Sequence, residues 1–151
     1  MMEIQVYLRR PTVHGRLYPR YDDEADLLVV SRALLEPCPY GIDVDGTLVF
    51  DLDADHVLAN FELLVPKRLW HVVSTSEAPR PSREAEIVFS QSSVIQKSFH
   101  LPLEVRTNEL QSYADIRIGR SEKEAIWVAL SGSCFALLTR DRLKGFFVSL
   151  K

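Results

Sequence analysis

Apolar and polar residues alternate with a period of two along most of the chain, which is the pattern of half-buried β-strands. Near the N-terminus, Ile4, Val6 and Leu8 alternate with more polar neighbours, which predicts a first strand. Similar short runs predict further strands over 27–30, 48–50, 57–65, 68–73, 86–90, 101–106, 114–119, 125–131, 135–139 and 146–150. The pattern therefore predicts a mainly β protein built from antiparallel hairpins in a meander.

Two kinds of interruption divide these strands. The acidic segment 51–56 lies between two apolar runs and predicts a hairpin turn, whereas 74–83 is rich in Ser and Pro and predicts a long loop. The pattern allows at most one or two short helices, over 83–87 or 107–114. We expect residues 1–151 to form a single compact domain, with two similar halves, 1–73 and 84–151, joined by the loop 74–83.

The similarity of the halves rests on two internal matches. Residues 24–31 resemble 124–131 at an offset of 100 positions. The apolar residues Leu58, Phe61, Leu63 and Val65 recur as Leu143, Phe146, Val148 and Leu150 at an offset of 85. These matches predict two similar β units that share one core. Short β segments also align by chance, so the alternative is two unrelated halves.

Composition is that of an ordinary globular domain, since 46% of the 151 residues are hydrophobic and 26% are charged. No apolar run approaches the roughly 18 residues of a membrane span, and the N-terminal segment lacks the features of a signal peptide. We therefore expect a soluble, cytoplasmic protein without membrane contact. The two cysteines, Cys38 and Cys134, have no ligand-type spacing and are expected to be reduced, so no metal site is predicted.

Charge is distributed unevenly along the chain. Residues 22–62 contain eight Asp and three Glu but only Arg32, a net charge of −10, whereas the segments before and after are net positive. Such a segment repels phosphates, which excludes a nucleic-acid-binding surface there. It could attract a cationic protein or a divalent ion; alternatively, the acids are simply turn residues. The candidate partner-binding residues are Asp22, Asp23, Asp26, Asp51, Asp53 and Asp55.

One stretch of the acidic segment carries a family resemblance. The residues Tyr21-Asp22-Asp23-Glu24-Ala25-Asp26, then 48–53 and 58–64, resemble the domain-of-unknown-function family 2283, a family of small bacterial β domains. The match covers about Tyr21 to Val65, and an insertion around 37–46 departs from the family pattern. The resemblance implies a β-meander fold, and it implies no activity and no catalytic residues.

A second resemblance points to an enzyme. The sequence Asp43-Val44-Asp45-Gly46-Thr47 is similar to the first motif of the haloacid dehalogenase-like phosphatases. That resemblance implies Asp43 as nucleophile, Asp45 as general acid and base, and Mg²⁺ as cofactor. The family places this motif after a buried parallel strand in a helix-rich domain, whereas this chain alternates as hairpins. Asp-Gly is also a common pair in tight hairpin turns, which is the reading we prefer.

Three functional hypotheses follow. The preferred one is a non-enzymatic protein-binding module without a cofactor, acting on a cationic protein as an antitoxin or immunity protein does. An edge strand that pairs with a second copy would also give a homodimer. The alternatives are a Mg²⁺-dependent phosphatase that uses Asp43 and Asp45, and a β cavity for a small ligand whose residues the sequence does not identify.

Overall fold

A computed structural model describes residues 3–34, 36–74, 78–120 and 122–150. Half of the chain is in strands and very little is helical, so the predicted mainly β class is confirmed. The elements are β1 (Val6–Arg9), β2 (Tyr18–Asp22), β3 (Leu27–Ser31), β4 (Tyr40–Val44), β5 (Leu48–Leu52), β6 (Leu58–Leu63), the 3-10 helix η1 (Lys67–Leu69), β7 (His71–Val72), β8 (Arg83–Glu84), β9 (Glu86–Phe89), α1 (Gln91–Gln96), β10 (Ser98–Phe99), β11 (Leu103–Thr107), β12 (Tyr113–Ile118), β13 (Ile126–Ala129), β14 (Cys134–Thr139) and β15 (Arg142–Ser149).

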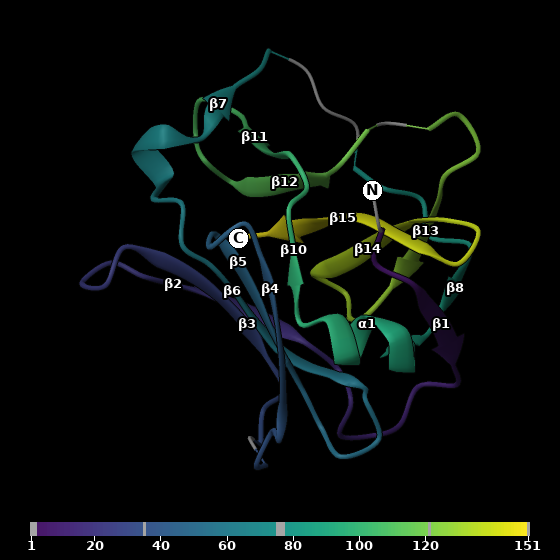
Figure 1. The fold of residues 1–151 in the computed structure, drawn as a ribbon. Helices are drawn as coiled ribbons and strands as arrows, with labels where there is room; N and C mark the ends of the chain where they lie inside the picture. The colour runs from purple at the N-terminus through teal and green to yellow at the C-terminus, as the bar shows by residue number, and fades with distance from the viewer. Residues whose placement is uncertain (1–2, 35, 75–77, 121, 151) are drawn as a thin grey trace.

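The strands form two large sheets and one pair (Figure 1). The six-stranded sheet has the order β10-β4-β5-β6-β3-β2, and the seven-stranded sheet has the order β7-β11-β12-β15-β14-β13-β8. Strands β1 and β9 form the two-stranded sheet. The first large sheet comes from the first half of the chain except for β10, and most of the second comes from the second half.

The core forms where the two large sheets face each other. Alternation places Phe50 and Phe61 of the first sheet, and Phe146 of the second, on the inner faces, where none of the three is exposed to solvent. The rings of Phe61 and Phe146 stack at 4.4 Å between centroids, and Phe50 lies 5.8 Å from Phe146. Because aromatic rings bury large apolar areas, this cluster joins the two sheets in one hydrophobic core.

The two large sheets repeat the same strand arrangement. Read in equivalent directions, β4-β5-β6-β3-β2 corresponds to β13-β14-β15-β12-β11, and every neighbouring pair within these two sets is antiparallel. A two-residue strand adds in parallel outside β4 and outside β13, as β10 and β8 respectively. Both β5–β6 and β14–β15 have an irregular register at the corresponding point. The predicted pair of similar β units with one shared core is therefore present.

Register identifies the equivalent residues. Val30 pairs with Phe61, and Ile116 pairs with Phe146, so the offset is 86 positions for β3 and 85 for β6. The predicted offset of 85 between the apolar residues of β6 and β15 is thus confirmed. The predicted match of 24–31 with 124–131 is wrong, because β3 occupies the sheet position of β12 and not that of β13.

One strand near the start of each half, β1 and β9 respectively, makes contacts with the other half. Strand β1 pairs with β9, and Val6 also donates its backbone N–H to Asp141 in the β14–β15 turn, at 2.7 Å. In the equivalent contact, Phe89 of β9 donates to His56 in the β5–β6 turn, at 2.9 Å. Backbone N–H and C=O groups of the two halves thus form hydrogen bonds with each other, which buried backbone polar groups require. The two halves are interlocked as well as stacked.

Some local predictions were wrong. The segment 68–73 was expected as one strand, but it contains the end of η1 and only the short β7. Neither 83–87 nor 107–114 is helical, since both contain strands; the α-helix is instead Gln91–Gln96, and Ser90 caps it by accepting from the backbone N–H of Ser93. The strands β2 and β4 were not predicted. Within the predicted loop 74–83, residues 75–77 lie outside the described part of the chain, and Arg83 begins β8.

The phenylalanine stack gives a test of the packing between the sheets. We expect Phe61→Leu and Phe146→Leu each to lower the free energy of unfolding by about 1–3 kcal/mol. The double variant should lose less than the sum, by about 1 kcal/mol, because each substitution alone already removes the ring pair. Urea denaturation of the four proteins, followed by circular dichroism, measures this coupling. Strictly additive losses would contradict the packing described above.

Candidate functional site

The outer face of the six-stranded sheet gathers carboxylates on neighbouring strands. Alternation turns Asp43 of β4, Asp51 of β5 and Glu62 of β6 away from the core, while Phe50 and Phe61 point inward. Val49 lies opposite both Asp43 and Glu62 in the register, so it stands between them. Since neighbouring strands lie about 4.8 Å apart, the three carboxylates surround Val49 within roughly 10 Å. We call Asp43, Asp51 and Glu62 the acidic triangle.

No lysine or arginine in the described ranges lies within 4.0 Å of the acidic triangle. Two arginines of this half, Arg20 and Arg32, have other acidic partners. Arg20 lies 3.9 Å from Asp22, and the largely buried Arg32 lies 3.0 Å from Asp53. Asp51 accepts a hydrogen bond of 2.7 Å from the side-chain amide of Asn60, which orients its carboxylate without neutralising it. Among the described residues, the acidic triangle therefore has no cationic side chain that pairs with its carboxylates.

The fold itself does not require these acids. At the equivalent positions of the seven-stranded sheet lie Ala129, Leu137 and Phe147. There Phe147 stacks on Tyr113 at 4.8 Å between ring centroids and is only 7% exposed. The same backbone position thus accepts an apolar residue in one half and a carboxylate in the other. The acids of the six-stranded sheet are a feature of its surface rather than of its architecture.

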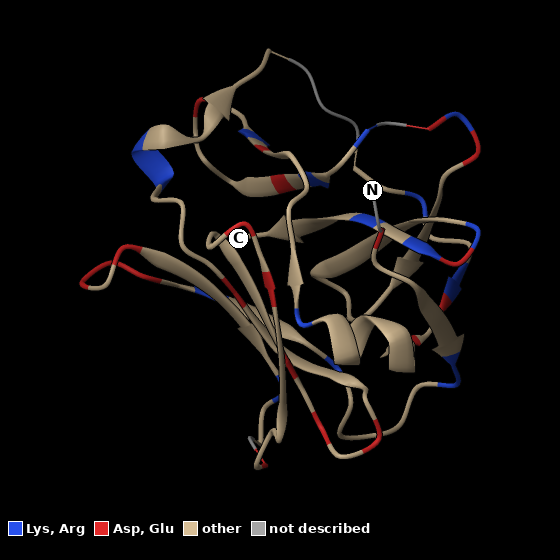
Figure 2. Cartoon of the chain, viewed as in Figure 1, with Lys and Arg blue, Asp and Glu red and all other residues tan. Residues whose placement is uncertain are grey.

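Acids of the second half are mostly neutralised within the molecule. Glu84, Glu86, Glu104, Asp115 and Glu122 each have an arginine or lysine nitrogen within 4.0 Å. Asp115, only 4% exposed, lies between Arg106 and Arg117 at 3.4 and 2.7 Å. Figure 2 shows the contrast, with red segments on the six-stranded sheet and its turns at the lower left. Unpaired negative charge is concentrated on the first half.

The six predicted partner-binding aspartates form two groups rather than one patch. Asp22, Asp23 and Asp26 lie in and beside the β2–β3 turn, where Asp22 accepts from the backbone N–H of Glu24 and Ala25. The other three, Asp51, Asp53 and Asp55, lie at the β5–β6 end of the sheet. Because β3 and β6 are antiparallel, these two turns lie at opposite ends of the sheet.

Some of the aspartates in this segment are explained by the turns in which they lie. Asp53 accepts backbone hydrogen bonds from Asp55 and Val57, at 2.9 and 3.0 Å, and pairs with Arg32. Burial raises the pKa of Asp53, but these hydrogen bonds and the arginine more than offset it, so its pKa is lowered overall. The turn interpretation thus holds for Asp22 and Asp53. The sequence did not predict that Asp43 and Glu62 join Asp51, because this requires the register as well as the alternation.

The motif Asp43-Val44-Asp45-Gly46-Thr47 forms the hairpin turn between β4 and β5. Thr47 donates its backbone N–H to Val44 at 3.0 Å, and Asp45 and Gly46 have φ of 53° and 70°, the pattern of a type I′ turn. Asp43 accepts from the backbone N–H of Gly46 at 3.2 Å. The turn interpretation is therefore confirmed. The phosphatase hypothesis expected a helix-rich domain, whereas α1 is the only α-helix among the described residues.

This turn gives a stability prediction. Gly46→Val should lower the free energy of unfolding by about 1–2 kcal/mol, because a β-branched residue is strained at positive φ. Asp45→Gly should be neutral or slightly stabilising at the same turn, because glycine adopts positive φ freely. Thermal unfolding of both variants checks this pair. Equal stability of Gly46→Val and the unsubstituted protein would be incompatible with the positive φ at this residue.

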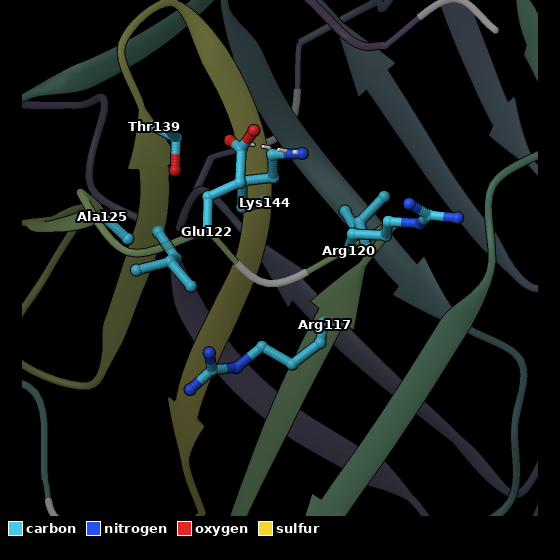
Figure 3. Close-up of a pocket in the computed structure, with 9 residues that line it drawn as sticks. Arg117, Arg120, Glu122, Ala125, Thr139 and Lys144 are labelled. Atoms are coloured by element: carbon cyan, nitrogen blue, oxygen red, sulfur yellow. Dashed lines mark ion pairs between the residues drawn. The ribbon is translucent and has the colours of Figure 1, made fainter.

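A small pocket lies on the second half, lined by Arg117, Arg120, Thr139 and Lys144 among others (Figure 3). Its volume of about 30 Å³ suits a water molecule or two and is far below that of a ligand site. Lys144 is buried and its ammonium is already neutralised by Glu3 at 2.9 Å and Glu122 at 3.6 Å. In Figure 3 the guanidinium groups of Arg117 and Arg120 point away from each other. This pocket does not form a convergent anion site.

Nucleophiles and metal ligands are sparse in the described ranges. No group of three or more His, Cys, Asp or Glu residues there could hold a metal ion. Burial raises the pKa of both Cys38 and Cys134, so neither thiol is activated as a thiolate. His56 has φ of 66° in the β5–β6 turn, as expected for a turn residue.

No helix in the described ranges is long and apolar enough to cross a membrane.

One buried carboxylate stabilises the fold. Glu86 is 4% exposed and accepts from Arg9 at 2.8 Å and from the backbone N–H and hydroxyl of Thr12 at 2.9 and 2.7 Å. Gly15 lets the loop close over it, because a Cβ there would lie 1.6 Å from the Glu86 Oε2. Burial alone would raise the pKa of Glu86, but the Thr12 and Arg9 hydrogen bonds lower it overall.

This lowered pKa predicts how stability depends on pH. Glu86 stabilises the fold above its ordinary pKa of about 4.5, and this contribution is lost as the pH falls through the lower folded-state pKa. We expect Glu86→Gln to cost about 1–3 kcal/mol at pH 7 and to reduce the loss of stability between pH 5 and 3. Urea denaturation at several pH values measures both. An unchanged pH profile in Glu86→Gln would contradict this role.

Comparisons with known proteins assign this chain to no family. No protein-family model matches the chain, and no curated protein matches it. The resemblances to family 2283 and to the haloacid dehalogenase-like phosphatases therefore stay predictions.

Proposed function

We propose that this protein is a non-enzymatic binding module, and that the outer face of its six-stranded sheet binds a cationic surface of another protein. The observation that supports the proposal is the acidic triangle of Asp43, Asp51 and Glu62. Its carboxylates have no cation within 4.0 Å in the described part of the chain, although the equivalent positions of the other sheet are apolar. Neutralisation of a basic protein, as an immunity protein or antitoxin achieves it, is one form of this function.

The shape of the face suits arginine and lysine side chains. Gly41 lies opposite Asp51 on β4, so its position in β4 adds no side chain next to the carboxylate. Along the same row, past Asn60 and Ser31, lies Tyr18, which is 48% exposed. An exposed tyrosine ring offers a second favourable contact to a cation. Bidentate hydrogen bonding to carboxylates is the strongest mode of arginine recognition.

Unpaired charge on this face affects the rate of association most strongly. A field of one sign steers an oppositely charged protein toward the face and raises its association rate, and salt screens this effect. Once the partner is bound, desolvation offsets part of the electrostatic gain. We therefore expect binding that is fast, salt-sensitive and specific for basic partners.

Capture from a lysate of the native host, at low and high salt, tests the function. The triple variant Asp43→Asn, Asp51→Asn, Glu62→Gln should lose a basic partner that the unsubstituted protein retains at low salt, with affinity lowered at least about tenfold. The partner is identified by mass spectrometry and its affinity is then measured with purified protein.

The matched control changes three exposed acids of the second half, Glu104→Gln, Glu109→Gln and Glu124→Gln, with the same change in net charge. The control should bind as the unsubstituted protein does. If the two triple variants lose affinity equally, net charge rather than the acidic triangle explains binding. If neither loses affinity, the proposal is wrong.

A further inference from the structure

A second surface lies at one end of the six-stranded sheet, where several apolar side chains face solvent. Leu64, Leu69, Val72 and Leu110 are between 41% and 81% exposed. They come from neighbouring segments, since β7 pairs with β11 and the side chain of Gln111 donates to the carbonyl of Lys67 in η1 at 3.0 Å. We call these four residues the apolar corner. Exposed large hydrophobic residues that gather on adjoining segments are typical of interaction surfaces.

Two charged elements of opposite sign flank the apolar corner. The β2–β3 turn carries Asp23, Glu24 and Asp26, all exposed, and η1 carries Lys67 and the exposed Arg68. Figure 2 shows both elements on the same side of the molecule, the turn in red and η1 in blue. None of these charges except that of Asp26, through Tyr21, has a polar side-chain partner among the described residues.

Tyr21 fixes the distance between these two elements. Its hydroxyl donates to the carboxylate of Asp26 and accepts from the backbone N–H of Lys67 at 3.1 Å. The ammonium of Lys67 lies 4.2 Å from the centre of its ring, and the buried Trp70 packs edge-on against it at 5.9 Å. Tyr21 thus connects the acidic turn to η1 before any partner binds, and such preorganisation lowers the entropic cost of binding.

We propose that this surface binds a second copy of the chain. A two-fold interface uses the same surface on both partners, so a residue that contacts a given site is contacted by that site in return. A surface with adjoining acidic and basic elements is complementary to itself under such a rotation, because each acidic turn meets the η1 of the other copy. The apolar corners of both copies are buried at the centre, with the charges at the rim, which is the usual anatomy of a protein interface.

The free edge of the same sheet is a poorer route to a dimer. Strand β2 is the longer of the two edge strands of this sheet, and its second residue, Pro19, lacks a backbone N–H. Proline on an edge strand hinders pairing with another copy. The dimer that we infer therefore uses side chains of the corner rather than backbone pairing along β2.

Analytical ultracentrifugation of the whole chain at low salt tests the proposal. The unsubstituted protein should sediment as a dimer, whereas Leu69→Glu and Arg68→Glu should each sediment as folded monomers. Ile95→Glu on α1 is the matched control, because Ile95 is 69% exposed and lies far from η1 (Figure 1). It should remain dimeric.

A charge-exchange experiment gives the sharper result. The variant Asp23→Lys, Glu24→Lys should be monomeric alone, as should Arg68→Glu. Mixed together, the two should form a heterodimer, because both contacts then pair opposite charges. A monomeric unsubstituted protein, a dimer unaffected by Leu69→Glu and Arg68→Glu, or a mixture that stays monomeric would each overturn the proposal. Loss of partner binding in the acidic-triangle variant alone would leave it intact, since the two surfaces share no residue.

Discussion

The stacking of Phe61 on Phe146 is the interaction on which the rest of the structure depends. These two rings occupy equivalent positions on β6 and β15, at the centre of the two large sheets. The inner face of each sheet is hydrophobic, so neither sheet can bury the apolar residues of that face without the other. The exchange of β1 and β9 between the halves adds backbone hydrogen bonds to this packing. The ring stack and the reciprocal contacts of β1 and β9 both join equivalent parts of the two halves.

The inner faces of both sheets are buried in the core, whereas the outer faces of the two sheets differ in their residue types. The first half places carboxylates where the second half places Ala129, Leu137 and Phe147. The two halves also differ in charge pairing. The buried acids Glu86 and Asp115 have arginine partners, whereas no lysine or arginine of the described residues lies within 4.0 Å of the acidic triangle. In a fold with two equivalent sheets, the outer face of one sheet can thus contribute to stability while the outer face of the other is available to a partner. The functional proposal rests on this asymmetry.

The sequence predicted the features that alternation and turn chemistry control. The β class, the β5–β6 hairpin, the Asp45-Gly46 turn and the offset of 85 between β6 and β15 all follow from local patterns. The predictions from sequence failed for segments that have few buried apolar residues of their own. Strand β2 is an exposed edge strand, and α1 has six residues with only Ser93 and Val94 buried. The acidic triangle required the register of three strands, and the apolar corner required the contact of η1 with the β11–β12 turn, neither of which periodicity reveals.

Native-state hydrogen exchange, measured residue by residue by nuclear magnetic resonance, tests the interlocked core most directly. The backbone amides of Val6 and Phe89 cross between the halves to Asp141 and His56. They should therefore exchange only through global unfolding, with the same free energy as the amides of the central strands β6 and β15. Exchange of Val6 and Phe89 through local opening, at a free energy well below that of β6 and β15, would show that the halves are not interlocked and would contradict this description of the fold.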